Sequence, residues 1–435
     1  MRSILSRAGM SRRRFLRGSG ITLGAVALPG CATTSRASAR PAFPRLREVM
    51  AAQLAPDKLP GAVWLVAHGD HVVVDKIGVS SIGGTVPMAR DTIFRIASMT
   101  KAMTAAAVMM LVEDGKLALD APAQRWLPEL ANRRVLRRID GAVNDTVPAS
   151  RPITVRDLLT FTLGFGILFD DKMPIQRAID ELKLVNGQPV PMTPYTPDEW
   201  MTRFATLPLM HQPGERWMYN TGSLLQGVLI RRASGQTLEA FFRDRISMPL
   251  GMRDTGFHVP REKLARFAGC GAFTHPQKGP TRMDADGAQS AYASPPVFPS
   301  GAGGLVSTVD DYLAFARLLL AGGVHQGRRL LSAESVREMT RDQLTAEQKA
   351  ASAATFFPGF FDAHGWGYGV GVSTAPDAVS PIPGRYGWDG GFGTSWLNDA
   401  SRGLVAIVMT QSSDFLFGGG LVQFWRTLYQ ELPRA

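Results

Sequence analysis

The stretch Ile96-Ala97-Ser98-Met99-Thr100-Lys101 opens a run rich in Ala, Met, Leu and Val, which extends to Glu113 and stops at Asp114-Gly115. Such a run predicts a buried helix of about four turns with a glycine stop. Ser98 and Lys101 are three residues apart at the helix start, so their side chains share one face. Helix starts also offer unpaired N–H groups and a positive dipole end, which stabilise an oxyanion. The tetrapeptide alone fits a nucleophile beside a base as well as a capping serine beside a surface lysine.

Apolar runs that predict strands lie toward both ends of the chain. Gly61 to Ala67 and Val72 to Val79 flank the turn His68-Gly69-Asp70, which is a hairpin pattern. Thr394 to Leu397 and Gly403 to Met409 form a second pair, separated by a short polar turn. Helical patterns account for much of the remaining sequence, at 155–162, 197–206, 222–234, 237–247, 308–321 and 419–431.

This order of elements predicts the fold class. We expect a mixed α/β (α+β) chain whose antiparallel sheet is built from both chain ends, is flanked by helices and is interrupted by a large, mostly helical insertion. The sheet part should cover about 41–115 and 298–435, and the helical part about 116–297. No linker, low-complexity segment or internal repeat divides the sequence, so 41–435 is expected to be a single domain.

Residues 1–40 read as a separate export signal. Paired arginines within Ser11 to Arg17 precede the apolar run Ile21 to Leu28, which is too short to span a bilayer. The stretch resembles a twin-arginine signal, although a basic amphipathic arm has a similar composition. We therefore expect a periplasmic or secreted protein. Cleavage after Ala39 is one outcome, and lipidation of Cys31 is another, which would give the only membrane contact.

The basic charge of the chain comes mainly from this leader. The formal net charge is +11, and residues 1–40 hold eight arginines and no acidic residue, which leaves +3 for the rest. That value removes the main argument for a nucleic-acid partner.

Two further motifs could take part in chemistry. A phenol such as Tyr219 acts as a base only where a nearby cation holds down its pKa, and Lys101 could be that cation. A tyrosine before a helix more often serves packing. The motif Gly387-Trp388-Asp389-Gly390-Gly391 precedes the terminal strands, and its glycines would let backbone N–H groups approach a ligand. A plain hairpin entry would look the same.

Taken together, these motifs resemble the serine β-lactamase-like family, which holds class C β-lactamases, penicillin-binding D,D-peptidases and family VIII carboxylesterases. The resemblance runs from about Leu59 to Gln411. It rests on four further blocks in the family's order, namely Phe94 to Lys101, Leu111 to Leu117, Pro249 to Met252 and Ser300 to Leu305.

The resemblance implies a role for each matching residue. Ser98 would be the acylated nucleophile, Lys101 and Tyr219 the pair that handles its proton, and the N–H groups of Ser98 and Gly391 the oxyanion hole. Both lysine and tyrosine have ordinary pKa values of about 10, so the two residues together would offer one shared basic site.

Departures from the family pattern point to the substrate. Class C β-lactamases carry Tyr-x-Asn, whereas the third position here is Thr221, and the family's Lys-Thr-Gly is replaced by Trp388-Asp389-Gly390. The cation that would bind a penicillin carboxylate is therefore missing, which resembles the carboxylesterase branch. The altered motif Phe161-Thr162-Leu163-Gly164 is interpreted as packing.

The expected function is an exported serine hydrolase that cleaves short-chain carboxylic esters through an acyl-enzyme on Ser98. Trp388, Asp389, Gly390 and Thr221 would contact the substrate, a small ester. The alternatives are acyl transfer to an alcohol other than water, a weak β-lactamase or D,D-peptidase, and a non-enzymatic protein that binds cell-wall peptides.

Other reaction classes lack their motifs. No serine lies in Gly-x-Ser-x-Gly, the seven histidines are scattered without His-Glu-x-x-His, and no phosphate loop or dinucleotide fingerprint follows a strand. We therefore expect neither a cofactor nor a metal. Cys270 stands among small residues and is interpreted as a buried packing thiol.

Overall fold

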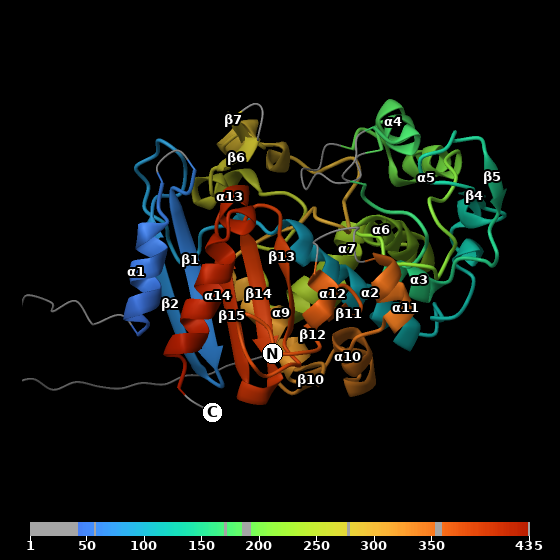
Figure 1. The fold of residues 1–435 in the computed structure, drawn as a ribbon. Coiled ribbons are helices and arrows are strands. Elements are labelled where there is room, and N and C mark those ends of the chain that lie inside the picture. Colours follow the sequence, from blue (N-terminus) through green and yellow to red (C-terminus); the bar gives the residue numbers. More distant parts are fainter. Residues whose placement is uncertain are drawn as a thin grey trace, which may run out of the picture. The chain divides into compact units, whose positions relative to one another are not determined.

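The hairpin predicted near the start of the chain joins strands from its end in one antiparallel sheet, in the order β11-β12-β13-β14-β15-β1-β2. β1 (Gly61–His68) pairs with β2 (His71–Gly78) on one side and with β15 (Leu404–Met409) on the other. The sheet continues through β14 (Thr394–Asp399), β13 (Tyr386–Gly390), β12 (Gly371–Ser373) and β11 (His364–Trp366). Figure 1 shows these blue and red strands side by side. The predicted fold class is confirmed.

The computed structural model describes residues 42–55, 58–168, 172–184, 193–275, 279–352 and 359–433, and the side chains of these residues except at 272–281. The expected leader at 1–40, with Cys31 and both processing positions, lies outside the described residues. Residues Pro41–Ala435 form one compact unit.

Two layers of helices cover the sheet because its central strands are apolar on both faces. On β1, Trp64 and Val66 pack with residues of α1 (Pro44–Ala52) and α14 (Gly420–Glu431). Val63 and Leu65 point the other way and pack with α2 (Thr100–Glu113) and α9 (Val309–Leu320). In Figure 1, α1 and α14 lie in front of the sheet, and α9 lies behind it.

The helical part lies beside this sheet. Its helices are α3 (Val155–Thr160), α4 (Pro174–Glu181), α5 (Pro197–Ala205), α6 (Thr221–Ser234), α7 (Leu238–Phe242) and α8 (Met248–Leu250). The helix expected at 237–247 is present: α7 passes without a break into a π-helical segment at Arg243–Ser247 and then into α8. α6 packs against both α2 and α3, which brings the helical part against the helix that begins directly after Ser98.

Short elements complete the fold. The two-residue strands β3 (Phe94–Arg95) and β8 (Val306–Ser307) pair just before the turn that carries Ser98. The other two-stranded ribbons are β4 (Arg134–Leu136) with β5 (Thr146–Pro148), β6 (Ala272–His275) with β7 (Gly279–Arg282), and β9 (Val324–His325) with β10 (Arg328–Arg329). The remaining helices are α10 (Ala333–Thr340), α11 (Ala346–Ser352), α12 (Phe360–Ala363) and α13 (Ser413–Phe417).

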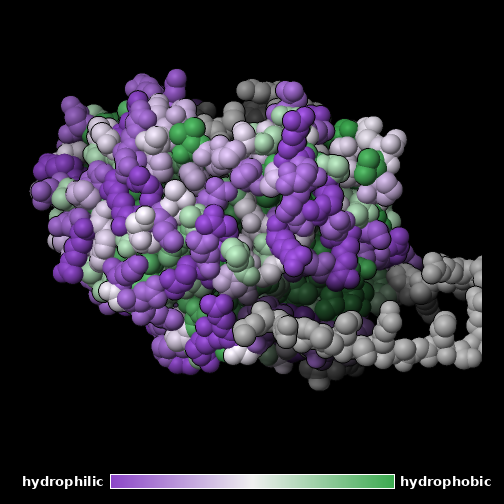
Figure 2. All heavy atoms as spheres, turned by 180° about the vertical axis from the view of Figure 1, so that it is seen from behind, coloured by the Kyte–Doolittle hydropathy of each residue, from purple (hydrophilic) through white to green (hydrophobic). Residues whose placement is uncertain are grey.

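Hydrophilic side chains cover most of the face seen from behind, with apolar residues scattered among them (Figure 2). Among the described residues, no helix has both the length and the apolar character needed to cross a bilayer.

Candidate active site

Ser98 lies in a short 3-10 turn, Ala97–Met99, directly before α2. The backbone of Ala97 has φ 43°, a left-handed conformation that is uncommon for a residue with a side chain. This turn gives Ser98 some exposure, while the helix behind it is buried on all sides. The nucleophile candidate therefore stands at a strained turn, an arrangement that persists only where the surroundings hold it.

Lys101 points at Ser98. Its Nζ lies 2.9 Å from Ser98 Oγ and donates a second hydrogen bond to the carbonyl oxygen of Ala302 at 2.6 Å. The side chain is completely buried, and burial lowers the pKa of Lys101 well below its ordinary value of 10.5. The alternative of a capping serine beside a surface lysine is therefore wrong. A buried amine held next to a serine hydroxyl is able to act as its base.

Tyr219 completes the group from the helical part. The Lys101 Nζ lies 4.5 Å from the centre of the Tyr219 ring, and the phenol is hydrogen-bonded to Ser98. Trp388 donates its indole N–H to the phenol oxygen at 2.7 Å. Burial raises the pKa of Tyr219. The three predicted residues Ser98, Lys101 and Tyr219 are thus brought together, although they lie on different parts of the sequence.

Burial shifts the pKa values of both groups toward the neutral form, lowering that of Lys101 and raising that of Tyr219. This differs from the prediction that Lys101 acts as a cation that holds down the pKa of the phenol. A neutral amine with a neutral phenol holds the same number of protons as an ammonium with a phenolate. The pair therefore keeps one basic site, and the direction of both pKa shifts favours Lys101 over Tyr219 as its location.

β13 carries the glycine-rich motif past the nucleophile turn. At Gly390, a Cβ atom would lie 2.4 Å from the carbonyl oxygen of Ile96, so the end of this strand needs a residue without a side chain. Gly391 follows immediately, and its carbonyl accepts a hydrogen bond from Ser413 Oγ at 2.5 Å. The backbone of Gly390 and Gly391 is therefore positioned next to the turn that carries Ser98.

Successive side chains of β13 point to opposite faces of the sheet. Trp388 lies opposite Trp396 and reaches Tyr219, whereas Asp389 lies opposite Ser395 and accepts its hydroxyl hydrogen at 2.5 Å. Burial raises the pKa of Asp389 to about 6. The structure thus brings Trp388 into the group around Ser98, whereas the side chain of Asp389 points to the opposite face of β13. The predicted contact of Asp389 with a substrate stays a prediction. Thr221 begins α6 and is 1% exposed, so it offers a substrate little surface.

Comparison with known proteins identifies the family. The model described as beta-lactamase matches residues 46–419. The chain belongs to the beta-lactamase family. Protein Rv1367c of Mycobacterium tuberculosis is 41% identical over 374 residues, which cover 84% of this chain and 88% of that protein. Esterase EstB of Burkholderia gladioli is 32% identical over 389 residues, which cover 85% and 90% of the two chains.

A solved structure supports the same fold. EstCE1, described as a hydrolase with promiscuous acyltransferase activity, matches with a TM-score of 0.70 and 22% identity, covering 88% of this chain and 97% of that one. The expected resemblance to the serine β-lactamase-like family is therefore confirmed, and this member of the beta-lactamase family is a serine hydrolase.

Several residues of this beta-lactamase family site were not predicted. Phe161, Trp217 and Trp366 have ring centres 5.9, 5.6 and 6.2 Å from that of Tyr219. Phe161 was interpreted as packing, and it packs directly on the Tyr219 ring. The Ala302 carbonyl was also missed, because backbone atoms leave no trace in residue type. Trp217 stands two residues before Tyr219, a spacing that could have indicated a shared environment.

The described residues contain no group of three or more His, Cys, Asp or Glu side chains placed to hold a metal ion. Cys270 is a buried free thiol, and burial raises its pKa.

Proposed function

We propose that this protein is an exported serine hydrolase that cleaves short-chain, neutral carboxylic esters through an acyl-enzyme on Ser98. The observation that carries this proposal is the indole of Trp388, which donates to the Tyr219 hydroxyl at 2.7 Å. The indole has one N–H donor and an apolar face but no positive charge. A neutral ester needs no cation there, whereas a penicillin must place its carboxylate in this part of the site.

Acylation begins at the neutral amine of Lys101. The amine takes the proton of Ser98 as Oγ attacks the ester carbonyl carbon, which forms a tetrahedral oxyanion. The backbone N–H groups of Ser98 and Gly391 stabilise that oxyanion. The carbon–oxygen bond to the leaving group then breaks, and the alkoxide takes a proton from the phenol of Tyr219. Tyr219 then recovers its proton from the ammonium of Lys101, which returns both side chains to their neutral forms beside the acylated Ser98.

Deacylation repeats the same proton path with a new nucleophile. Water attacks the acyl carbonyl, gives up a proton to the Lys101–Tyr219 pair and releases the carboxylic acid from Ser98, which regains its hydroxyl hydrogen. An alcohol in place of water would give acyl transfer, and the description of EstCE1 as a hydrolase with promiscuous acyltransferase activity fits this second outcome. Added alcohols therefore belong in the assay.

A substrate screen tests the ester proposal. Purified protein is assayed on p-nitrophenyl esters of increasing acyl length, with and without a short alcohol, beside a chromogenic cephalosporin. We expect turnover of the short esters, its loss in Ser98→Ala, and labelling of Ser98 by a phosphonate ester in the wild type alone. Labelling that persists in Ser98→Ala, or a cephalosporin hydrolysed as well as the esters, would contradict the proposal.

The support for export comes from the sequence of residues 1–40 and not from the folded part of the chain. The paired arginines within Ser11 to Arg17 and the short apolar run after them support transport across the inner membrane in a folded state. Changing Arg12 and Arg13 to lysine should leave activity in the cytoplasmic fraction of a bacterial host, whereas the unchanged chain should move it to the periplasm. Equal distribution of the two chains would rule out the twin-arginine route.

A further inference from the structure

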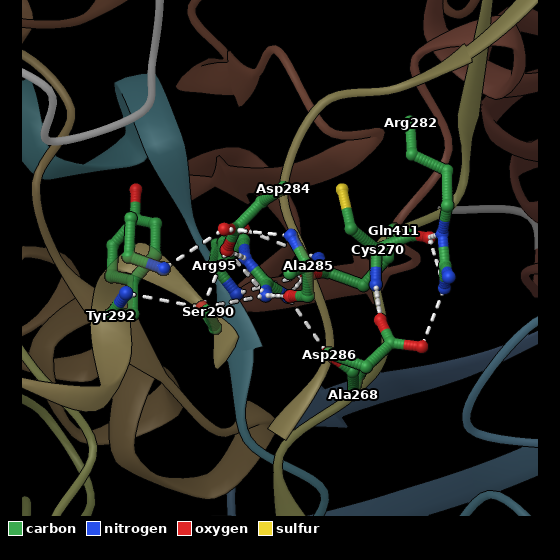
Figure 3. Close-up of polar contacts among 11 residues, drawn as sticks. Arg95, Ala268, Cys270, Arg282, Asp284, Ala285, Asp286, Ser290, Tyr292 and Gln411 are labelled. Atoms are coloured by element: carbon green, nitrogen blue, oxygen red, sulfur yellow. Dashed lines mark hydrogen bonds and ion pairs between the residues drawn. The ribbon is translucent and has the colours of Figure 1, made fainter. Parts of the chain in front are cut away.

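The nucleophile turn is attached to a buried polar cluster that the reaction described above does not use. Arg95, three residues before Ser98, is completely buried, and its partner Asp284 has a side chain that is 4% exposed. Arg95 donates Nε to Asp284 at 2.8 Å, and its Nη2 lies 2.6 Å from the same carboxylate. Figure 3 shows this ion pair at the centre of the cluster.

The guanidinium of Arg95 joins three segments that are far apart in the sequence. Besides Asp284, it donates to the carbonyl oxygen of Ala268 at 2.7 Å, to that of Ala285 at 3.1 Å and to Ser290 Oγ at 3.1 Å. Its Nη1 also donates to Gln411 Oε1 at 2.9 Å. Figure 3 shows these contacts converging on one guanidinium. A planar group with five donors in fixed directions is suited to hold such an arrangement rigidly.

Gln411 forms hydrogen bonds with the backbone of Arg95 as well as with its side chain. The Arg95 N–H donates to Gln411 Oε1 at 3.3 Å, and Gln411 Nε2 donates to the Arg95 carbonyl oxygen at 3.4 Å. The preceding residue, Thr410, donates to the carbonyl of Gly393 at 2.8 Å, and Ser413 donates to that of Gly391 at 2.5 Å. Residues 410–413 therefore contact the backbone beside both of the oxyanion donors, Ser98 and Gly391.

The strained conformation of Ala97 explains why the turn needs support from the cluster of Arg95, Asp284 and Gln411, which we call the clamp. A residue with a side chain at φ 43° keeps that conformation only when its surroundings leave it no alternative. Ala97 packs against Cys270 and Phe392, two residues that adjoin the segments held by the cluster. We infer that Arg95, Asp284 and Gln411 are positioning residues, which hold the Ala97 turn and β13 at the separation that lets Ser98 and Gly391 bind one oxyanion. This inference rests on the proposed function for its catalytic consequence.

Two variants test the clamp without leaving a charge buried alone. Arg95→Met with Asp284→Asn removes both charges, and the amide oxygen can still accept from the N–H groups of Ala285 and Ala291, as the carboxylate does. Replacing both partners of a buried pair is far better tolerated than removing one. Gln411→Met is the second variant and leaves the ion pair intact. The matched control is the double variant Arg232→Met with Glu129→Gln. In the wild type these two residues form an ion pair of 2.7 Å, and Arg232 also contacts the Trp126 carbonyl oxygen and Asp198.

Three readouts separate positioning from general stability. In both clamp variants, kcat on a short ester should fall by about tenfold to a hundredfold at nearly constant KM, since misplacing a group by about 1 Å can cost a hundredfold. The inhibition constant of a small boronic acid, which mimics the tetrahedral oxyanion, should rise by a similar factor. Hydrogen exchange of the amides at 95–100 should accelerate at least tenfold. The control should change the melting temperature and none of these three.

The outcomes decide the inference separately from the proposed function. Clamp variants that are folded and keep wild-type kcat, boronate affinity and amide exchange would overturn the inference. A parallel loss of kcat in the control would overturn it too, because the effect would then follow from lost stability. If the wild type had no Ser98-dependent ester turnover, the proposed function would fail, and the exchange measurement would still decide whether the cluster holds the turn.

Discussion

At the scale of single residues, the amine of Lys101 is useful to the reaction and costly to the fold. Burying this amine beside Ser98 destabilises its charged form, which is why the pKa of Lys101 falls. We predict that Lys101→Met reduces kcat by about 10²–10⁴-fold, the usual contribution of a general base, and stabilises the protein by about 0.5–2 kcal/mol. Kinetics on an ester and a thermal melt measure both. The exposed Lys116→Met is the control and should alter neither, whereas a destabilised Lys101→Met would refute the argument.

The lowered pKa of Lys101 also predicts a pH dependence. The value of kcat/KM should rise with pH as the amine loses its proton, with a midpoint well below 10.5. Between the folded and the ordinary pKa, the unfolded chain binds a proton that the folded chain does not, so stability contributed by this site rises with pH over the same window. Denaturant melts at several pH values should show that slope in the wild type and a smaller one in Lys101→Met. An activity midpoint at or above 10.5 would place the base elsewhere.

At the scale of elements, β13 determines both the substrate specificity and the distance between the strand end and the turn that carries Ser98. We predict that short esters exceed penicillins in kcat/KM by at least about a hundredfold, because an unpaired buried carboxylate costs several kcal/mol. Trp388→Lys should reduce this difference in kcat/KM by improving the binding of penicillins, and adding Thr221→Asn should reduce the difference further. Trp388→Phe removes the indole N–H and adds no cation, so it should leave the difference large. A wild type that hydrolyses both substrates equally would show that another cation binds the carboxylate.

The close approach of β13 to the nucleophile turn gives a second prediction for this element. A Cβ added at Gly390 would lie 2.1 Å from Thr394 Oγ1 as well as 2.4 Å from the Ile96 carbonyl oxygen, so Gly390→Ala should push the strand away from the turn. We expect a fall in kcat of about tenfold to a hundredfold. Gly256→Ala, where the nearest atom is 3.7 Å away, is the control and should retain kcat. Equal activity of the two variants would mean that the strand end can shift freely.

Elements with a strong local pattern could be predicted, and those defined by their neighbours could not. The continuous apolar run of β1, the Gly-Asp turn that joins it to β2 and the apolar run of α2 carry their structure in the local sequence. β13 reads as a turn because two of its five residues are glycine, and β11 and β12 have only three residues each. For α1, a helix opened by Pro44, no prediction was made.

The site shows the same division. Ser98, Lys101 and Tyr219 could be predicted because their motifs match those of a known family, in order and spacing. Arg95 and Asp284 are 189 residues apart, and no residue pattern indicates that they meet. The glycine-rich motif alone does not indicate that Trp388 and Asp389 point to opposite faces of the sheet, because this follows only from the strand assignment of β13.

At the scale of the whole molecule, the compact unit Pro41–Ala435 should carry the function without the leader. We predict that a chain lacking residues 1–40 has the same melting temperature and ester kcat/KM as the full-length protein, because residues of the compact unit build the complete sheet and the helix layers on both of its faces. Side-by-side melts and kinetics measure this. A shorter chain that melts at least several degrees lower would show that the leader takes part in the fold.

The pairing of β1 with β15 has a consequence for synthesis in the cell. Val63 lies opposite Met409, so the centre of the sheet joins residues made near the beginning of translation to residues made near its end. On a ribosome, β1 and its hairpin partner must wait for almost the whole chain before their neighbour exists, and until then their apolar faces are open to chaperones and to other nascent chains. A transport route that accepts only folded cargo would consequently exclude every product whose synthesis stops before β15, since such a product cannot close the sheet.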